Sequence, residues 1–157
     1  VLEAIKNNGY AIEYVDQIFK KDKKIVLEAI KIDGTLISYA DKSLTKDRDV
    51  ILHAVKAHGA ALEYADDAFK KDREIVLEAV KQHGSAIQYA DENFRKDNEI
   101  VLEAVKKDGY ALEYADDSFK KNKGNLVSVK GYFSFSYNAN HTTQPFLFIV
   151  KKINESF

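Results

Sequence analysis

Residues 72–91 read DREIVLEAVKQHGSAIQYAD, and this stretch decides the fold because it returns at residues 97–116 as DNEIVLEAVKKDGYALEYAD. The offset is 25 residues, and the same unit can be followed back to the start of the chain in five copies without an insertion. Self-similarity at a fixed period is typical of a repeat array in which each unit stacks on its neighbours. One glycine and one tyrosine mark every unit: Gly9, Gly34, Gly59, Gly84 and Gly109, and Tyr14, Tyr39, Tyr64, Tyr89 and Tyr114. We therefore predict an all-α solenoid of five two-helix repeats over residues 1–122, followed by a divergent tail over residues 123–157.

Each unit is predicted to contain two short helices. The first begins after a capping aspartate such as Asp72 and buries the stripe Ile75, Val76, Ala79 and Val80. We expect it to end at the glycine, whose missing Cβ permits a left-handed closing conformation. The second helix starts directly after the glycine, spans about two turns and finishes as a 3₁₀ turn near residues 66–70. Because such short helices are marginal alone, each must pack on its neighbours, which gives an array about 45 Å long at roughly 8–10 Å per packed helix.

The pattern D-x-E-I-V-L-E-A-V-K-x-x-G-x-A-L-x-Y-A-D resembles the family called domain of unknown function 4116. The resemblance covers residues 1 to about 122, nearly four fifths of the chain. It implies helical tandem repeats in bacterial and protist proteins and no assigned activity. The resemblance thus supports the fold and leaves the function open.

The composition favours an ordinary soluble chain. Hydrophobic residues make up 45% and charged residues 31%, and the net charge of −1 creates no global attraction to nucleic acid or to anionic membranes. The chain has no cysteine, which excludes thiolate chemistry and favours an intracellular, cytoplasmic setting. No apolar run is long enough to span a bilayer. Because the first residue, Val1, aligns with the middle of a repeat, we expect the sequence to be an excerpt of a longer protein.

Several polar and aromatic residues recur in every unit and are candidate binding or metal sites. The tyrosine column is expected to pack between units with its hydroxyls at the rim, rather than to form a binding strip, and the column Phe19, Leu44, Phe69, Phe94 and Phe119 is expected in the core. The acidic column of Asp16, Asp41, Asp66, Asp91 and Asp116 suits helix caps better than a cation site. His58 and His83 could meet across adjacent units, but two histidines without a third ligand make a poor zinc site. We predict no catalytic residue, no metal and no cofactor.

A basic ridge is the most prominent candidate surface. It lies in the connections between units and comprises Lys20, Lys21, Lys23, Lys46, Arg48, Lys70, Lys71, Arg73, Arg95, Lys96, Lys120, Lys121 and Lys123. Such a stripe could follow a polyanion backbone, since phosphate contacts need only charge and spacing. Aspartates lie within the ridge, however, and no aromatic residues interleave with the lysines as base-stacking platforms would. A solvated rim is therefore the favoured interpretation.

The repeat fails after Lys121. Residues 126–137 instead alternate, with Val127, Val129, Phe133 and Phe135 sharing one parity, and a second apolar run follows at residues 146–153. One hypothesis is a β-hairpin that caps the open end of the array and packs on the last unit. The other is a reading-frame slip, because codons for Lys123-Gly124-Asn125 read one base later can spell Lys-Glu-Ile, the expected start of a sixth unit.

An extended stack of short repeats suits recognition better than catalysis. We therefore expect a protein-interaction scaffold that is not an enzyme, does not bind membranes and has another protein as its partner. Two alternatives stay open. The first is binding of nucleic acid or another polyanion along the basic ridge, and the second is a role as the recruiting arm of a larger enzyme.

Overall fold

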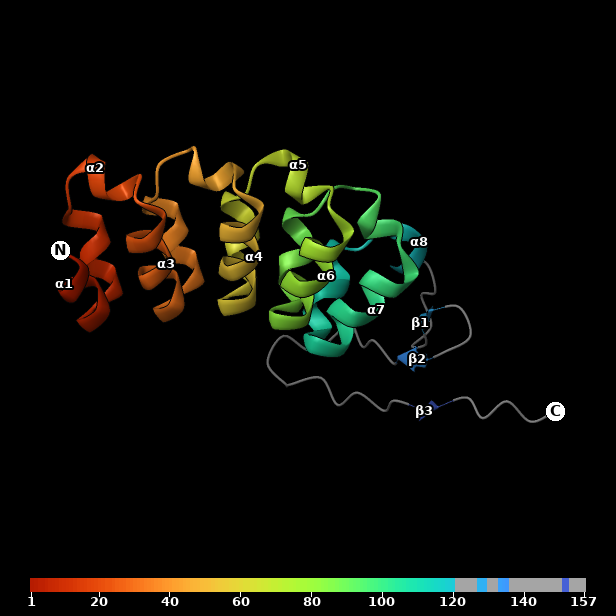
Figure 1. Ribbon diagram of the computed structural model, residues 1–157. Helices are drawn as coiled ribbons and strands as arrows, with labels where there is room; N and C mark the ends of the chain where they lie inside the picture. The colour runs from red at the N-terminus through yellow and green to blue at the C-terminus, as the bar shows by residue number, and fades with distance from the viewer. Residues whose placement is uncertain (121–126, 130–132, 136–150, 153–157) are drawn as a thin grey trace.

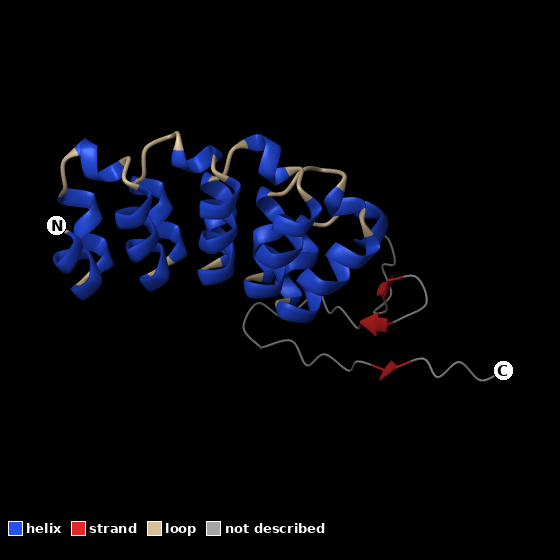
Figure 2. Ribbon diagram, in the orientation of Figure 1, coloured by secondary structure: helices blue, strands red, loops and turns tan. Residues whose placement is uncertain are grey.

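The computed structural model describes residues 1–120, together with residues 127–129, 133–135 and 151–152. Over residues 1–120 the chain forms units that stand side by side, from the N-terminus at one end to α8 at the other (Figure 1). Every regular element in this part of the chain is helical (Figure 2). The predicted all-α repeat array is confirmed.

Each complete unit has three helical pieces. The long α-helices are α3 (Lys23–Ile32), α4 (Arg48–Ala57), α6 (Arg73–Gln82) and α7 (Asn98–Lys107), and the first unit has the shorter α1 (Leu2–Asn7). Next come the 3₁₀-helices η1 (Gly9–Tyr14), η2 (Gly34–Tyr39), η4 (Gly59–Tyr64), η5 (Gly84–Tyr89) and η7 (Gly109–Tyr114). The third piece alternates between a short α-helix, in α2 (Gln17–Lys20), α5 (Asp67–Lys70) and α8 (Asp117–Lys120), and a 3₁₀ turn, in η3 (Leu44–Lys46) and η6 (Phe94–Lys96).

The second segment of each unit differs from the sequence prediction. It was expected to be an α-helix with a 3₁₀ finish near residues 66–70, but the 3₁₀ conformation occupies Gly59–Tyr64 itself, and residues 67–70 are α-helical. An alanine C-terminal to the 3₁₀-helix, Ala65, then takes extended backbone angles and separates the two pieces. Two short helices with different axes thus replace one longer helix, which lets the chain turn back toward the next unit.

The starts of the long helices follow the prediction. The Asp72 side chain accepts hydrogen bonds from the amides of Glu74 and Ile75, and Asp22, Asp47 and Asp97 cap their helices in the same way. These caps satisfy amides that have no partner within the helix. The cap therefore sets the position at which the buried stripe begins in every unit.

The marker glycines serve a purpose other than the predicted left-handed closure. None of Gly9, Gly34, Gly59 and Gly84 has a positive φ, and the residue before each glycine closes the α-helix in an extended conformation. A Cβ on Gly59 would lie 2.2 Å from the carbonyl oxygen of Ala79 in the next unit. Glycine is needed here because the backbone of one unit touches the backbone of the next.

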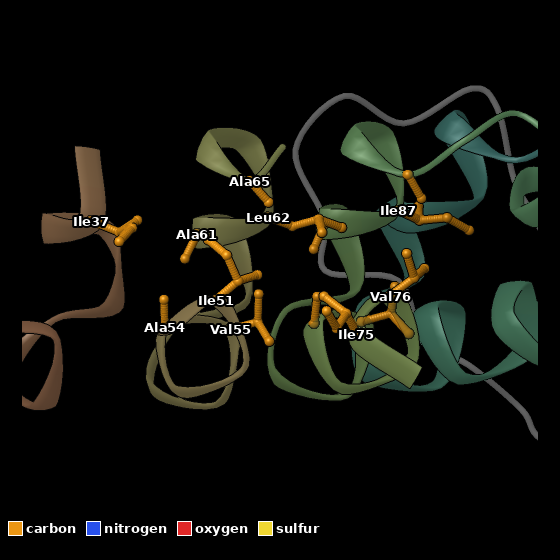
Figure 3. Packing of buried hydrophobic residues seen from close by; sticks show 14 of the residues in the cluster. Ile37, Ile51, Ala54, Val55, Ala61, Leu62, Ala65, Ile75, Val76 and Ile87 are labelled. Atoms are coloured by element: carbon orange, nitrogen blue, oxygen red, sulfur yellow. The ribbon is translucent and has the colours of Figure 1, made fainter. Parts of the chain in front are cut away.

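The units build two layers with the core between them. Neighbouring long α-helices pack on one another, neighbouring 3₁₀-helices do the same, and each 3₁₀-helix also contacts α-helices. Each long helix buries the predicted i, i+1, i+4, i+5 stripe, for example Ile75, Val76, Ala79 and Val80, and Leu62 of the other layer is also fully buried (Figure 3). The column that contains Phe119 and Leu44 is buried or packed against this core, as predicted. One continuous apolar core therefore runs along the array.

A backbone hydrogen bond ties each short helix to the next unit. The amide of Asp66 donates to the carbonyl of Thr45 at 3.1 Å, and equivalent bonds of 2.9 Å join Asp41 to Lys20, Asp91 to Lys70 and Asp116 to Arg95. The aspartate whose amide bonds to the preceding unit thus also accepts, through its side chain, a hydrogen bond from an amide of its own unit. Both functions recur at the same spacing as the repeat.

Three short strands follow the array. β1 (Val127–Val129) pairs antiparallel with β2 (Phe133–Phe135), which in turn pairs antiparallel with β3 (Lys151–Lys152), and β1 contacts α8. Two paired strands, β1 and β2, therefore lie within the alternating run of residues 126–137, and β3 lies in the second apolar run of residues 146–153. Residues 121–126, which include Lys121 and Lys123, lie outside the described residues. The hypothesis of a reading-frame slip at residues 123–125 therefore stays a prediction.

Candidate functional site

Part of the basic ridge forms an ion-pair ladder between units. The first residue of α3, α4 and α6 reaches the two acids at the start of the next long helix, so Lys23 contacts Asp47 at 2.9 Å and Asp49 at 3.0 Å. Arg48 pairs in the same way with Asp72 (3.3 Å) and Glu74 (2.5 Å), and Arg73 with Asp97 (3.3 Å) and Glu99 (2.7 Å). The capping aspartate therefore serves its own helix and the neighbouring unit at once.

The ladder changes the electrostatic character of the ridge. Hydrogen bonds that Lys23 donates to Asp47 and to Asp49 raise the pKa of Lys23, while the Lys23 ammonium lowers the pKa of Asp47. A base followed by acids 24 and 26 residues later is the sequence signal for this arrangement, and the sequence analysis missed it. Three positive charges assigned to a polyanion surface are thus neutralised by acids of the next unit.

Loss of one ladder base is expected to have a small, salt-dependent cost. Because the Arg73 side chain is 44% exposed, we expect Arg73→Gln to lower the free energy of unfolding by about 1 kcal/mol in low salt and by less in 0.5 M NaCl. Lys71→Gln removes the same charge from a lysine outside the ladder and should change stability by less than about 0.5 kcal/mol. Urea denaturation at both salt concentrations tests this, and equal effects of the two substitutions would contradict it.

Other basic residues of the ridge bind the array itself. The Lys20 ammonium donates to the carbonyl of Glu13 at 2.8 Å, and the Arg95 guanidinium donates to the carbonyls of Gln88 and Ala90. Lys70 lies 3.5 Å from Asp67 in the same short helix. These side chains stabilise the ends of the 3₁₀-helices and the short helices, and their charges are only partly available to a ligand.

A row of four lysines is the part of the ridge that is both exposed and unpaired among the described residues. Each belongs to one unit, and within the described part of the chain none has a side-chain hydrogen bond or an ion pair: Lys21, Lys46, Lys71 and Lys96. The side chain of Lys120 and all of Lys121 and Lys123 lie outside the described residues. The candidate polyanion surface therefore narrows from thirteen residues to this lysine row.

The tyrosine column is divided between packing and exposure. Tyr39, Tyr89 and Tyr114 pack against the core, as predicted, whereas Tyr14 is 83% exposed and Tyr64 is 39% exposed. Burial raises the pKa of Tyr89, and the hydroxyls of Tyr64 and Tyr114 raise it further. Neighbouring tyrosines of the column therefore influence one another across the units.

Two tyrosines of the column interact with a glutamate of the preceding unit. The Glu13 carboxylate raises the pKa of Tyr39 through its charge and through a hydrogen bond, and Glu63 also raises the pKa of Tyr89. At the equivalent positions before Tyr64 and Tyr114 the chain has Ser38 and Gln88. The glutamates and the alternation of the short helices both recur after 50 residues, so the array has a double repeat that the sequence analysis missed.

The acidic column is used for capping. Asp16, Asp66 and Asp116 each accept a hydrogen bond from the amide two residues later, at 3.0, 3.1 and 2.9 Å. Asp41 and Asp91 accept the same bond from the amides of Ser43 and Asn93, in the turns that precede η3 and η6. The capping interpretation is confirmed for Asp16 and Asp66, which are the N-caps of α2 and α5, whereas Asp41 and Asp91 stabilise a turn.

His58 and His83 meet across adjacent units, as the sequence analysis anticipated. Their ring centroids lie 4.0 Å apart, and Nδ1 of His83 accepts a hydrogen bond from the amide of Gly59 at 3.2 Å. Nδ1 of His58 is buried without a partner. Both histidines occupy the N-cap position of a 3₁₀-helix, where the other units have an Asn or Asp whose side chain caps the helix, for example Asp33.

This contact predicts a pH-dependent loss of stability. Burial lowers the pKa of His83, with contributions from His58 and Lys107 that exceed the opposing effect of Asp33. The unfolded chain therefore binds the proton more readily, so the contribution is complete above the unfolded pKa and is lost as the pH falls below about 6.5. We expect the melting temperature to drop between pH 7.5 and 5.5, and less so for His83→Asn, which restores the cap seen at Asn8. An identical pH dependence for both chains would contradict this.

Within the described residues no group of three or more histidines and carboxylates is placed to hold a metal ion. No helix in that part of the chain combines the length and the apolar character needed to cross a membrane.

Comparisons with known proteins give one match. The model of a family described as domain of unknown function (DUF4116) matches the chain three times, over residues 1–45, 47–95 and 74–120. No curated protein and no solved structure matches it. The three matches cover the helical array and leave the strands outside, in agreement with the resemblance seen in the sequence.

Proposed function

The chain belongs to the DUF4116 family of repeats, and from its surface we propose that it is a protein-interaction scaffold whose partner lies along several units at once. The observation that carries this proposal is the column of tyrosines on a stack of contacting 3₁₀-helices, in which Tyr14 and Tyr64 are exposed and the others are partly buried. Tyrosine contributes a large contact area at low entropic cost and is enriched in protein interfaces.

The internal order of the array supports the proposal. Caps, backbone bonds and the ion-pair ladder hold each unit against the next, so the exposed columns keep a fixed spacing. A rigid surface loses little conformational freedom when a partner binds, which favours affinity. Solenoid proteins generally use such extended surfaces for recognition. We further propose that these 157 residues act by binding and not by catalysis.

A second candidate function rests on the lysine row. Lys21, Lys46, Lys71 and Lys96 place one unpaired positive charge on each of four successive units, as a phosphate backbone would require. Aspartates and the neutralised ladder border this row, which makes polyanion binding the less favoured of the two.

Capture experiments distinguish the two functions. The native chain and a variant with these four lysines changed to glutamine, which keeps the ladder intact, would be used to capture proteins and nucleic acids from lysate of the source organism. Recovery of the same protein by both chains is the result expected of a scaffold. Loss of nucleic acid from the variant, with an affinity that falls steeply between 50 and 200 mM salt, would replace the scaffold with polyanion binding.

A further inference from the structure

The outer face of the 3₁₀ layer has an unusual composition. Every tyrosine among residues 1–120 lies in one of its helices: Tyr10, Tyr14, Tyr39, Tyr64, Tyr89, Tyr110 and Tyr114. The charged residues of these five helices are Glu13, Glu63 and Glu113, with no lysine or arginine among them. We call this surface the tyrosine–glutamate face. It is aromatic and acidic, while the outer surface of the α layer carries paired lysines and glutamates such as Lys31 and Glu28.

Two places on this face combine a carboxylate with tyrosine rings. Glu13 lies in η1 between the buried Ile12 and the exposed Tyr14, and it raises the pKa of Tyr39 in the next unit. Two units farther along, Glu63, Tyr64 and Tyr89 repeat the arrangement. A carboxylate has about four lone-pair sites, so a hydrogen bond from one tyrosine leaves room for a second donor.

Two basic side chains that reach this layer are already bound to backbone carbonyls. Lys20 donates to the carbonyl of Glu13, and Arg95 donates to the carbonyls of Gln88 and Ala90. Both Glu13 and Glu63 are exposed.

We propose that the tyrosine–glutamate face binds a basic, extended peptide segment, with one arginine at Glu13 and a second at Glu63. This proposal rests on the scaffold function and names the chemical class of its partner. A guanidinium can form charge-assisted hydrogen bonds with the carboxylate while its plane stacks on a tyrosine ring. Arginine fits this combination better than lysine, because the ammonium group of lysine cannot stack in the same way.

The double repeat sets the spacing of the two arginines. At roughly 8–10 Å between packed helices, sites two units apart are separated by about 16–20 Å. An extended chain advances about 3.3 Å per residue, so the matching arginines are about five to six residues apart. The unit between the two sites has Ser38 in place of glutamate, and it would contact the residues between the two arginines.

The test uses the whole chain and two fluorescein-labelled 12-residue peptides in an alanine, serine and glycine background. One peptide carries two arginines six residues apart, and the other carries two glutamates at the same positions. Fluorescence anisotropy should show binding of the arginine peptide and at least tenfold weaker binding of the glutamate peptide. Equal affinity for both peptides, or no binding of the arginine peptide, would overturn the proposal.

A matched pair of variants locates the site. Glu13→Gln with Glu63→Gln is expected to weaken binding of the arginine peptide at least tenfold. Glu28→Gln with Glu78→Gln removes the same charge, at the same 50-residue spacing, from the α layer, and should change the affinity less than twofold. Equal losses in the two variants would mean that the peptide senses only net charge, which overturns the assignment to this face.

Failure of this inference can be told from failure of the scaffold. If the Glu13/Glu63 variant still captures the same protein from lysate as the native chain, the scaffold function stands and the assignment of its binding site to the tyrosine–glutamate face is wrong. If the native chain captures no protein but binds the arginine peptide through these glutamates, the assignment to this face is right and the scaffold function is wrong.

Discussion

Gly59→Ala is expected to lower the free energy of unfolding by about 3 kcal/mol, although it adds a single methyl group. The new Cβ would lie 2.2 Å from the carbonyl oxygen of Ala79 and 3.0 Å from the amide nitrogen of His83. Both atoms belong to the backbone of the next unit, so no side-chain rotation can relieve the overlap. The two units must move apart, which also opens the buried core between them.

Gly9→Ala is the matched control for this substitution. It occupies the same column and loses the same freedom in the unfolded chain, but the atom nearest to its new Cβ is Cδ1 of Leu36, at 2.8 Å, which is the flexible end of a side chain. We expect Gly9→Ala to cost at least about 1.5 kcal/mol less than Gly59→Ala. Thermal and urea denaturation of both variants test this. Similar costs at the two positions would mean that the close approach between backbones does not explain the glycine column.

Much of the fold could be predicted from the sequence because its main determinants are local and recur. Asp72 and the stripe that includes Ile75 and Val76 define the start and the buried face of a helix within a few residues. The role of the glycine could not be read in this way, because Gly59 is constrained by Ala79 of another unit. Sequence reasoning assigned it a local function, whereas the packing of the array requires it.

The candidate surfaces show the same limit. The column of bases was visible as a ridge, but Arg48 and Arg73 are neutralised by acids that become neighbours only after the units stack. Likewise, the pKa of Tyr39 is raised by Glu13 of the preceding unit. Capping aspartates were recognised since their partners lie two or three residues away. Contacts across the 25-residue repeat could be found only by comparing each column with its neighbours one unit away.

Leu62→Ala should have an effect that reaches beyond its own unit. The Leu62 side chain is fully buried in the middle of the array, so its truncation is expected to lower the free energy of unfolding by about 3–4 kcal/mol (Figure 3). The η4 helix that carries it contacts η2 on one side and η5 on the other. Because a stacked array is stabilised by its nearest-neighbour interfaces, a weakened central unit should separate the unfolding of the two ends.

Leu112→Ala tests whether position in the array matters. It removes the same side chain from the same column in the last helical unit, where Leu112 is 8% exposed. We expect a smaller loss of stability and a single unfolding transition, because the preceding units keep their mutual interfaces. Leu62→Ala should instead lower the m-value in urea or divide the transition into two, since fewer residues then unfold together. If both variants shift one transition by the same amount with unchanged m-values, the chain unfolds as a single cooperative domain, and the description of its stability as a sum over neighbouring units is wrong.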